Sequence, residues 1–178
     1  MVAGSAGGRR IDVPPGTTTR PTSDRVREAL FNALDSLDVV EDRQVLDGFA
    51  GSGALGIEAL SRGAAHATFV DTDPVAVRVV EANLGSLGLD RRATVLTRAL
   101  DRALAVGGSF DLVLLDPPYA YDEWDDLFEL LAPTLSPDAV VVVESDREIP
   151  LPPGLAGIRS KTYGGTVVQF ASPSGAPS

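Results

Sequence analysis

Two segments of the chain hold residues whose types and spacing could do chemistry, and the first is a glycine-rich turn. Gly51, Gly53 and Gly56 form the pattern GxGxxG, Asp47 stands four residues before Gly51, and Asp71 stands about 20 residues after it. Such a turn brings the backbone close to a nucleotide, and the later acid can accept hydrogen bonds from a ribose. A nicotinamide-dependent dehydrogenase is therefore one interpretation.

The carboxylate of Asp47 favours a different ligand. An acid before the turn would repel a pyrophosphate, whereas it would attract a ligand whose nearby end is cationic. S-adenosylmethionine has such an end, because it carries an ammonium and a sulfonium group. Gly51 and Gly53 would pass close to its methionine and ribose parts, and Asp71 would accept from both ribose hydroxyls. In the alternative interpretation Asp47 only caps the helix that follows the turn.

The second segment is Asp116-Pro117-Pro118-Tyr119, directly after an apolar run. Two prolines that merely end a strand would explain Pro117 or Pro118, but not the acid before them and the aromatic residue after them. The exocyclic amine of a nucleobase is a poor nucleophile because its lone pair is delocalised. If Asp116 and the Pro117 carbonyl each accept one N–H, that lone pair can face a methyl donor, while Tyr119 stacks on the extruded base. The segment predicts methyl transfer to a base.

Alternating strands and helices must position these two segments. Apolar runs predict strands at 44–46, 67–70, 94–96, 110–115 and 139–144, with helical stretches near 53–62, 74–84, 100–106 and 123–131. Strands without polar alternation are buried on both faces, which is typical of a parallel sheet covered by helices. Two last strands, 157–163 and 166–171, are joined through glycines and must be antiparallel. We expect an α/β fold with a doubly wound, mostly parallel, seven-stranded sheet whose final strand is antiparallel.

The chain is expected to be a single domain, residues 1–178, with an N-terminal helical arm. Residues 1–8 and 172–178 are rich in small residues and are expected to be mobile, 9–37 to form a basic arm and helix, and 44–171 to form the catalytic core. The helix is predicted from a Thr22 or Ser23 cap and from apolar residues at helical spacing: Val26, Ala29, Leu30, Ala33, Leu34 and Leu37. Its polar face would carry Arg25, Arg27 and Glu28.

Composition excludes several classes of protein. The 178 residues include no cysteine and one histidine, so disulfides, thiolate metal sites and a Ser-His-Asp triad are not expected. We expect no bound metal. There is no apolar run of ~18 residues and no hydrophobic leader, and a cytoplasmic protein without membrane contact is expected.

The charge is unevenly distributed along the chain. The net charge is −10, but residues 1–27 contain five arginines and two aspartates, so this segment carries +3 and the remainder −13. A basic arm on an acidic body can meet a polyanion, and the candidate RNA-binding residues are Arg9, Arg10, Arg20 and Arg25. The alternative is a solvated arm without a partner.

The motifs together resemble a known family. The glycine turn followed by Asp116-Pro117-Pro118-Tyr119 resembles the Rossmann-like class I amino-methyltransferases, which depend on S-adenosylmethionine. With segments 20–32 and 46–64 added, residues 9–170 resemble the bacterial 16S rRNA guanine-N2 methyltransferases of the guanine-966 type. The resemblance implies that four residues serve the target guanine: Asp116, Pro117, Pro118 and Tyr119. It implies a cofactor site made of Asp47, Gly48, Phe49, Ala50, Gly51, Gly53, Asp71, Thr72, Ala99 and Thr22. The expected partner is 16S rRNA in a partly or fully assembled small subunit, met by a monomer.

One position departs from the family pattern. Where such enzymes often place Asp or Asn to bind the adenine amino group, this chain has Arg98, which cannot accept a hydrogen bond. The adenine is then expected to meet the Ala99 backbone and Thr72. Two other functions stay open: an adenine-N6 DNA methyltransferase, which would need a larger target-reading insertion, and a non-catalytic rRNA-binding or assembly module of the same fold.

Overall fold

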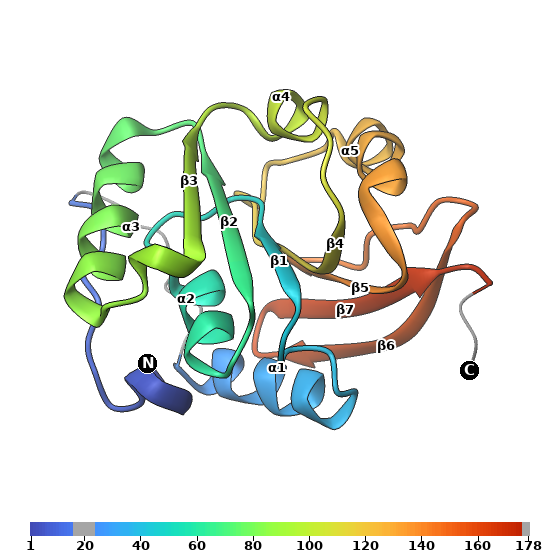
Figure 1. Cartoon of the computed structure of the whole chain (residues 1–178). Coiled ribbons are helices and arrows are strands. Elements are labelled where there is room, and N and C mark those ends of the chain that lie inside the picture. The colour runs from blue at the N-terminus through green and yellow to red at the C-terminus, as the bar shows by residue number, and fades with distance from the viewer. Residues whose placement is uncertain (16–23, 176–178) are drawn as a thin grey trace.

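The predicted apolar runs form the strands of one sheet in a computed structural model that describes residues 1–15 and 24–175, without the side chain of Asp24 (Figure 1). Arg20, Thr22 and Ser23, and the residues after 175, lie outside this part of the chain. The strands are β1 (Gln44–Asp47), β2 (His66–Asp71), β3 (Ala93–Thr97), β4 (Phe110–Leu115), β5 (Leu135–Ser145), β6 (Leu155–Tyr163) and β7 (Thr166–Pro173). Ser172 and Pro173 thus belong to a strand rather than to a mobile end.

The sheet has the strand order β3-β2-β1-β4-β5-β7-β6. The pairs from β3 to β5 are parallel, whereas β7 is antiparallel to both β5 and β6. This confirms the predicted sheet of seven strands, mostly parallel, with an antiparallel final strand. Because β7 lies between β5 and β6, β6 forms the edge of the sheet.

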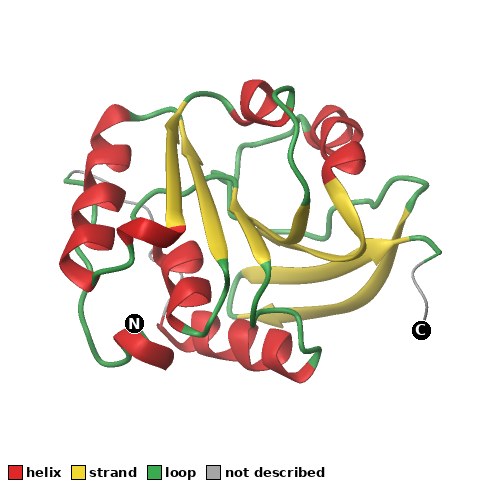
Figure 2. Ribbon diagram, viewed as in Figure 1, coloured by secondary structure: helices red, strands yellow, loops and turns green. Residues whose placement is uncertain are grey.

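Helices cover both faces of the sheet (Figure 2). One layer contains α1 (Asp24–Ser36), α2 (Ala54–Ser61) and α3 (Pro74–Leu87), and the other contains α4 (Leu100–Leu104) and α5 (Trp124–Leu131). Short 3-10 turns occur at Gly4–Ala6, Asp90–Arg92 and Ala132–Thr134. Along β4, Leu112 and Leu114 pack into the first layer while Val113 and Leu115 pack into the second, so the strand is buried on both faces. None of the helices within 1–15 and 24–175 has the length and apolar character needed to cross a membrane.

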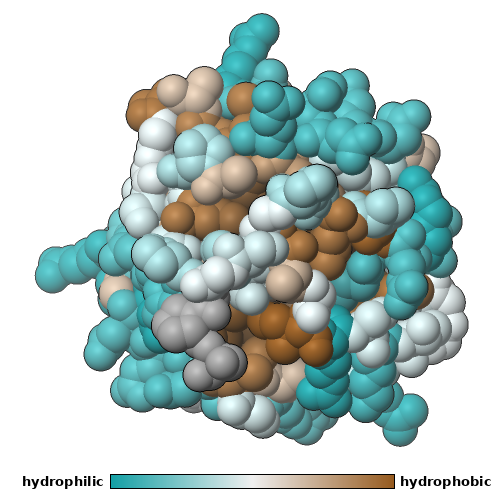
Figure 3. Space-filling view, turned by 90° about the vertical axis from the view of Figure 1, so that its right-hand side faces the viewer, coloured by the Kyte–Doolittle hydropathy of each residue, from teal (hydrophilic) through white to brown (hydrophobic). Residues whose placement is uncertain are grey.

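A groove of about 690 Å³ opens between α5 and the segment that leads into β6. Its lining comes from Phe128 on α5, from Leu135 and Leu155 at the starts of β5 and β6, and from a proline-rich segment at 150–153. Figure 3 shows apolar side chains among hydrophilic ones on this side of the molecule. The groove lies toward the amino ends of the parallel strands, away from the predicted site residues.

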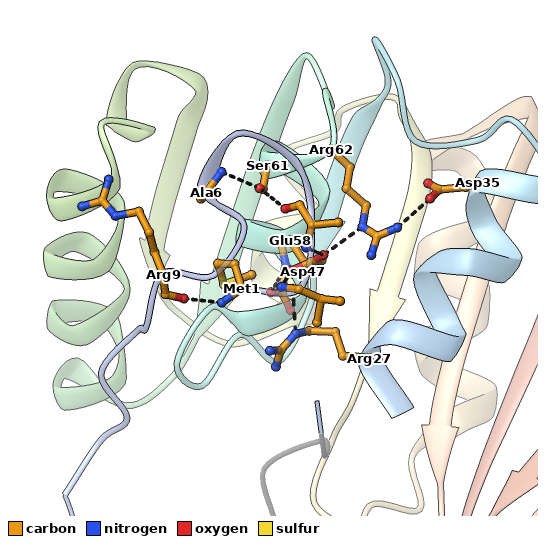
Figure 4. A network of polar contacts seen from close by, with 12 residues as sticks. Met1, Ala6, Arg9, Arg27, Asp35, Asp47, Glu58, Ser61 and Arg62 are labelled. Atoms are coloured by element: carbon orange, nitrogen blue, oxygen red, sulfur yellow. Dashed lines mark hydrogen bonds and ion pairs between the residues drawn. The ribbon is translucent and has the colours of Figure 1, made fainter. Parts of the chain in front are cut away.

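Residues 1–8 are packed against α2, which corrects the prediction of a mobile terminus. The carboxylate of Glu58 has no exposed surface and accepts hydrogen bonds from the backbone N–H groups of Val2 and Ala3, at 2.8 and 3.0 Å. The Ala6 N–H donates to the Ser61 hydroxyl at 2.9 Å, and the Ala6 side chain is buried (Figure 4). A buried carboxylate requires such partners, and the segment supplies them, while Met1 also packs against the hydrophobic core.

Helix α1 buries a wider face than the sequence predicts. Arg27, predicted on the polar face, is only 6% exposed, and its Nε lies 3.9 Å from the Glu58 carboxylate. Phe31 is fully buried, whereas Leu37 follows the helix end and is 40% exposed. The predicted Leu30, Ala33 and Leu34 are buried and Val26 packs against the core, so the predicted face is confirmed, and positions 27 and 31 extend it.

Candidate functional site

Three acidic residues stand where adjacent parallel strands end. Asp47 ends β1, Asp71 ends β2, and Asp116 directly follows β4. β1 pairs with both β2 and β4, with Asp47 opposite Phe69 on one side and Leu114 on the other. Because the strands are parallel, their carboxyl ends lie on one edge of the sheet. The structure thus brings the glycine turn and the Asp116–Tyr119 turn together, as the sequence predicts.

Asp47 is the buried member of these three acids. Its Oδ2 accepts a hydrogen bond from the Gly56 N–H in α2 at 2.8 Å, so the capping contact left open above is present. The pKa of Asp47 is raised to about 8, mainly by burial and also by the charges of Asp116 and Asp71, against the lowering effect of the bond from Gly56. A cationic ligand at this edge would offset the cost of ionising Asp47.

The glycine turn between β1 and α2 opens toward space. Gly51 and Gly53 have positive φ angles of 54° and 78°, which side chains rarely adopt, and a Cβ on Gly51 would meet no atom within 4 Å. The Gly51 N–H donates to Asp71 Oδ2 at 2.8 Å, which joins the turn to the end of β2. Gly56 serves packing instead, because its Cβ would lie 2.4 Å from the Phe69 ring.

The other predicted cofactor residues surround this turn. Gly48 and Ala50 are buried, with their N–H groups bonded to the Leu114 and Val70 carbonyls, and Phe49 is half-buried. Thr72 is exposed just beyond β2, and Ala99 precedes α4. The neighbouring Arg98 N–H donates to the Asp71 carbonyl at 3.0 Å, so the ends of β2 and β3 are joined by the backbone. Thr22 lies outside the described residues.

The Asp116–Tyr119 turn presents its aromatic residue to solvent. Pro117 is buried, Pro118 is exposed, and the Pro118 carbonyl accepts from the Tyr121 N–H at 2.8 Å. Tyr119 is 41% exposed, and its hydroxyl lies 3.1 Å from the Thr166 hydroxyl at the start of β7. The antiparallel strand therefore helps to fix the turn.

Sequence reasoning did not identify two residues that hold this turn. The Tyr121 ring lies 5.3 Å from the Phe49 ring and 5.1 Å from the Trp124 ring, which joins the turn to the glycine turn and to α5. Arg147, in the β5–β6 connection, donates to the carbonyls of Tyr119 and Tyr121 at 3.3 and 3.4 Å. Neither residue belongs to a periodic pattern or motif, so only the folded chain reveals it.

Asn83 of α3 joins the N-terminal arm to the glycine turn. It is 3% exposed; its Oδ1 accepts from the Asp12 N–H at 2.8 Å, and its Nδ2 donates to the carbonyls of Asp12 and Ser52, each at 3.0 Å. The arm runs along α3 in Figure 1, where the Arg9 guanidinium donates to the Ser86 carbonyl.

The candidate RNA-binding residues on the arm and α1 are Arg9, Arg10 and Arg25, and all three are exposed. Arg20, the fourth, lies outside the described residues. All three side chains are therefore accessible, although the Arg9 guanidinium already donates to the Ser86 carbonyl.

The strand order with its reversed strand, the glycine turn after β1 and the acidic turn after β4 define a class I methyltransferase. More narrowly, the chain belongs to the family described as "Conserved hypothetical protein 95", whose model matches residues 1–172.

Relatives of known name agree with this class. The chain is 40% identical over 177 residues to the candidate rRNA methyltransferase YlbH of Bacillus subtilis, covering 94% of this chain and 95% of YlbH. It is 39% identical over 154 residues to ribosomal RNA small subunit methyltransferase D of Escherichia coli, covering 85% of this chain and 77% of that protein. The solved structure of a candidate methyltransferase from Escherichia coli, yhhF, superposes with a TM-score of 0.86 at 36% identity, covering 97% and 96% of the two chains. The predicted enzyme class, a methyltransferase that uses S-adenosylmethionine, is confirmed.

Proposed function

We propose that this protein methylates the N2 amine of one guanine in the 16S rRNA of the small ribosomal subunit. The observation that carries the proposal is the Asp116–Tyr119 turn beside the glycine turn, in a chain whose relatives include small-subunit rRNA methyltransferases. In this proposal, residues 44–171 are the catalytic core of the enzyme, and residues 9–37 are the arm that binds RNA. We also propose that the protein acts as a monomer in the cytoplasm, on rRNA that belongs to a partly or fully assembled small subunit.

The residues at the strand ends fit S-adenosylmethionine on two counts. Gly51 faces space that a Cβ would enter without contact, and the buried Asp47 lies in the field of two further carboxylates, which suits a cationic ligand. Asp47, Gly51 and Gly53 would hold the methionine end, Asp71 the ribose, and Thr72 with the Ala99 backbone the adenine. When bound, S-adenosylmethionine supplies an electrophilic methyl group on a positively charged sulfur.

The residues of the second turn would orient the target amine. The Asp116 carboxylate and the Pro117 carbonyl each accept one N–H of guanine N2, which turns the nitrogen lone pair toward the methyl donor. Proline has no N–H of its own, so it offers an acceptor without a competing donor and with a fixed φ. The exposed Tyr119 ring stacks on the extruded base. The nitrogen gives up its proton to solvent water once the methyl group has exchanged its bond to sulfur for a bond to N2, so no strong general base is needed.

Mapping of methylated guanines in 16S rRNA by mass spectrometry tests the proposal. Cells that lack the protein should lose methylation at one guanine, and the wild-type gene should restore it. The Asp116→Ala variant should fail to restore it, since losing an oriented acceptor costs ~10²–10³ in rate, while calorimetry finds its affinity for S-adenosylmethionine nearly unchanged. Asp126→Ala, which removes an exposed carboxylate of α5, is the matched control and should restore methylation.

Three results would contradict the proposal or part of it. An unchanged set of methylated guanines in the deleted cells would refute the rRNA substrate. Loss of N6-methyladenine from their DNA would favour the DNA methyltransferase instead. Full restoration by Asp116→Ala would show that another group orients the amine.

A further inference from the structure

The cation held at the Asp116–Tyr119 turn is Arg147, from the connection between β5 and β6. Its guanidinium donates to the carbonyls of Tyr119 and Tyr121, at 3.3 and 3.4 Å, and pairs with the Asp146 carboxylate at 2.9 Å. The Arg147 side chain is nevertheless 49% exposed. Arg147 therefore keeps one edge against the turn and the other toward solvent.

The connection that carries Arg147 is itself fixed. The side-chain amide of Gln169, on β7, accepts from the Ile149 N–H at 2.6 Å and donates to the Ile149 carbonyl at 3.0 Å. These bonds are buried, and the Ser145 hydroxyl also donates to the Arg147 carbonyl. The glutamine thus anchors the segment two residues beyond Arg147, so the backbone that carries the Arg147 side chain is held in place.

The charge around the turn makes this cation significant. Four exposed acidic residues lie between positions 122 and 126, just after the turn, and the exposed Asp146 and Glu148 flank Arg147 in the sequence. A polyanion that delivers a base to the turn passes this acidic surface, and its phosphates are repelled except where a cation receives them.

We propose that Arg147 binds a backbone phosphate of the RNA next to the target guanine. The proposal rests on the function proposed above and adds a phosphate site on the target side of the molecule, separate from the arm. A base stacked on the Tyr119 ring lies one sugar away from its phosphate, on the same turn whose carbonyl Arg147 already contacts. The exposed pair with Asp146 contributes little, so a phosphate can replace that carboxylate. The planar guanidinium suits bidentate binding of phosphate oxygens.

A competing interpretation treats Arg147 as a clamp that only shapes the turn, and three substitutions separate the two. Arg147→Lys keeps the charge but loses the fork that spans two carbonyls, Arg147→Gln keeps N–H donors without charge, and Arg147→Ala loses both. Arg43→Ala is the matched control: Arg43 pairs with Asp138 at 3.0 Å and stands just before β1, at the opposite end of the sheet.

The experiment measures methyl transfer to small ribosomal subunits from cells that lack the protein, at several salt concentrations, together with S-adenosylmethionine affinity by calorimetry. Arg147→Ala and Arg147→Gln should lower kcat/KM about tenfold or more through KM. They should also flatten the slope of log kcat/KM against log salt by ~0.7–0.9, the value for one phosphate. Arg147→Lys should retain the wild-type slope, and cofactor affinity and the Arg43→Ala kinetics should not change.

Two outcomes overturn the inference and leave the proposed function standing. One is that Arg147→Ala still methylates the subunits and its slope of log kcat/KM against log salt equals that of the wild-type protein. The other is an equal fall in kcat for the lysine and alanine variants with no change of slope, which is the result expected of a clamp. Failure of the wild-type protein to methylate the subunits would instead refute the proposed function.

Discussion

The wild-type protein should release a proton from Asp47 when it binds S-adenosylmethionine, and the Asp47→Asn variant should not. With a pKa of about 8, Asp47 is roughly nine-tenths protonated at pH 7 in the free protein. A bound ammonium and sulfonium lower that pKa, so binding at pH 7 should release up to ~0.9 proton from this group. Ionising it costs ~1.4 kcal/mol at pH 7, so its contribution to affinity should improve about tenfold between pH 7 and pH 9.

Calorimetry in two buffers of different ionisation enthalpy measures this proton release. The ligand's own amine also titrates near pH 8, and Asp47→Asn is the control because it retains that effect while keeping an acceptor for the Gly56 N–H. The variant should bind ~1.5–3 kcal/mol more weakly above pH 8, with a smaller difference at pH 7. Equal proton release by the two proteins, together with equal affinity above pH 8, would refute the placement of the cationic end beside Asp47.

The same substitution should stabilise the free protein. The pKa of Asp47 is raised on folding from 3.8 to about 8. The free energy of unfolding is therefore at its full value below about pH 4, where Asp47 is protonated in both states, and it falls as the pH rises toward 8. Asn does not ionise, and its advantage should reach the order of 4 kcal/mol at pH 7. Thermal unfolding should show a Tm difference that widens between pH 5 and pH 8. A constant difference would mean that Asp47 ionises freely in the folded chain.

Three further predictions address the cofactor site and the arm. Asp71→Ala should weaken S-adenosylmethionine binding by ~1.5–3 kcal/mol in calorimetry, and unchanged affinity would place the ribose elsewhere. Joint replacement of Arg9 and Arg10 by Ala should weaken subunit binding and flatten its salt dependence by up to about two phosphates without affecting the cofactor, whereas an unaltered slope would show that both are merely solvated. Asn83→Ala should destabilise the protein by ~1–3 kcal/mol and weaken cofactor binding, because the Ser52 carbonyl loses its donor; a loss of stability with unchanged affinity would limit Asn83 to packing.

The parallel part of the sheet could be predicted because strands such as β4 and β5 contain runs of Val and Leu with no polar alternation, whereas the largely exposed β6 was predicted from its glycine link to β7. The start of α3 could also be predicted from the sequence. Pro74 is its first residue, and the Asp73 side chain caps it by accepting from the Val75 N–H at 2.8 Å. The sequence also predicted that the glycine turn and the Asp116–Tyr119 turn lie close together, since ligands in open α/β sheets bind at the carboxyl ends of strands. The roles of Asp47, Asp71 and Asp116 stay predictions until they are measured.

The contacts that depend on distant parts of the chain could not be predicted. Residues 1–8 show no periodicity, and the signal for their docking lies in Glu58, a lone acid in the apolar helix α2 whose buried carboxylate needs donors. The same carboxylate pairs with Arg27, which is buried although arginine usually lies at the surface. Arg147 gave no signal either, because its partners are backbone carbonyls that any sequence would offer.

The position of β7 between β5 and β6 has a consequence for local unfolding. β6 can detach alone, because it is the edge strand, but β7 cannot leave β5 without taking β6 with it. When that hairpin opens, the Asp116–Tyr119 turn loses Thr166 and the β5–β6 connection loses Gln169, while the glycine turn on β1 keeps its neighbours. Such an opening would leave a molecule able to bind its cofactor and unable to hold a base. Amide hydrogen exchange in β7 should therefore report how long each molecule remains competent for transfer, independently of cofactor occupancy.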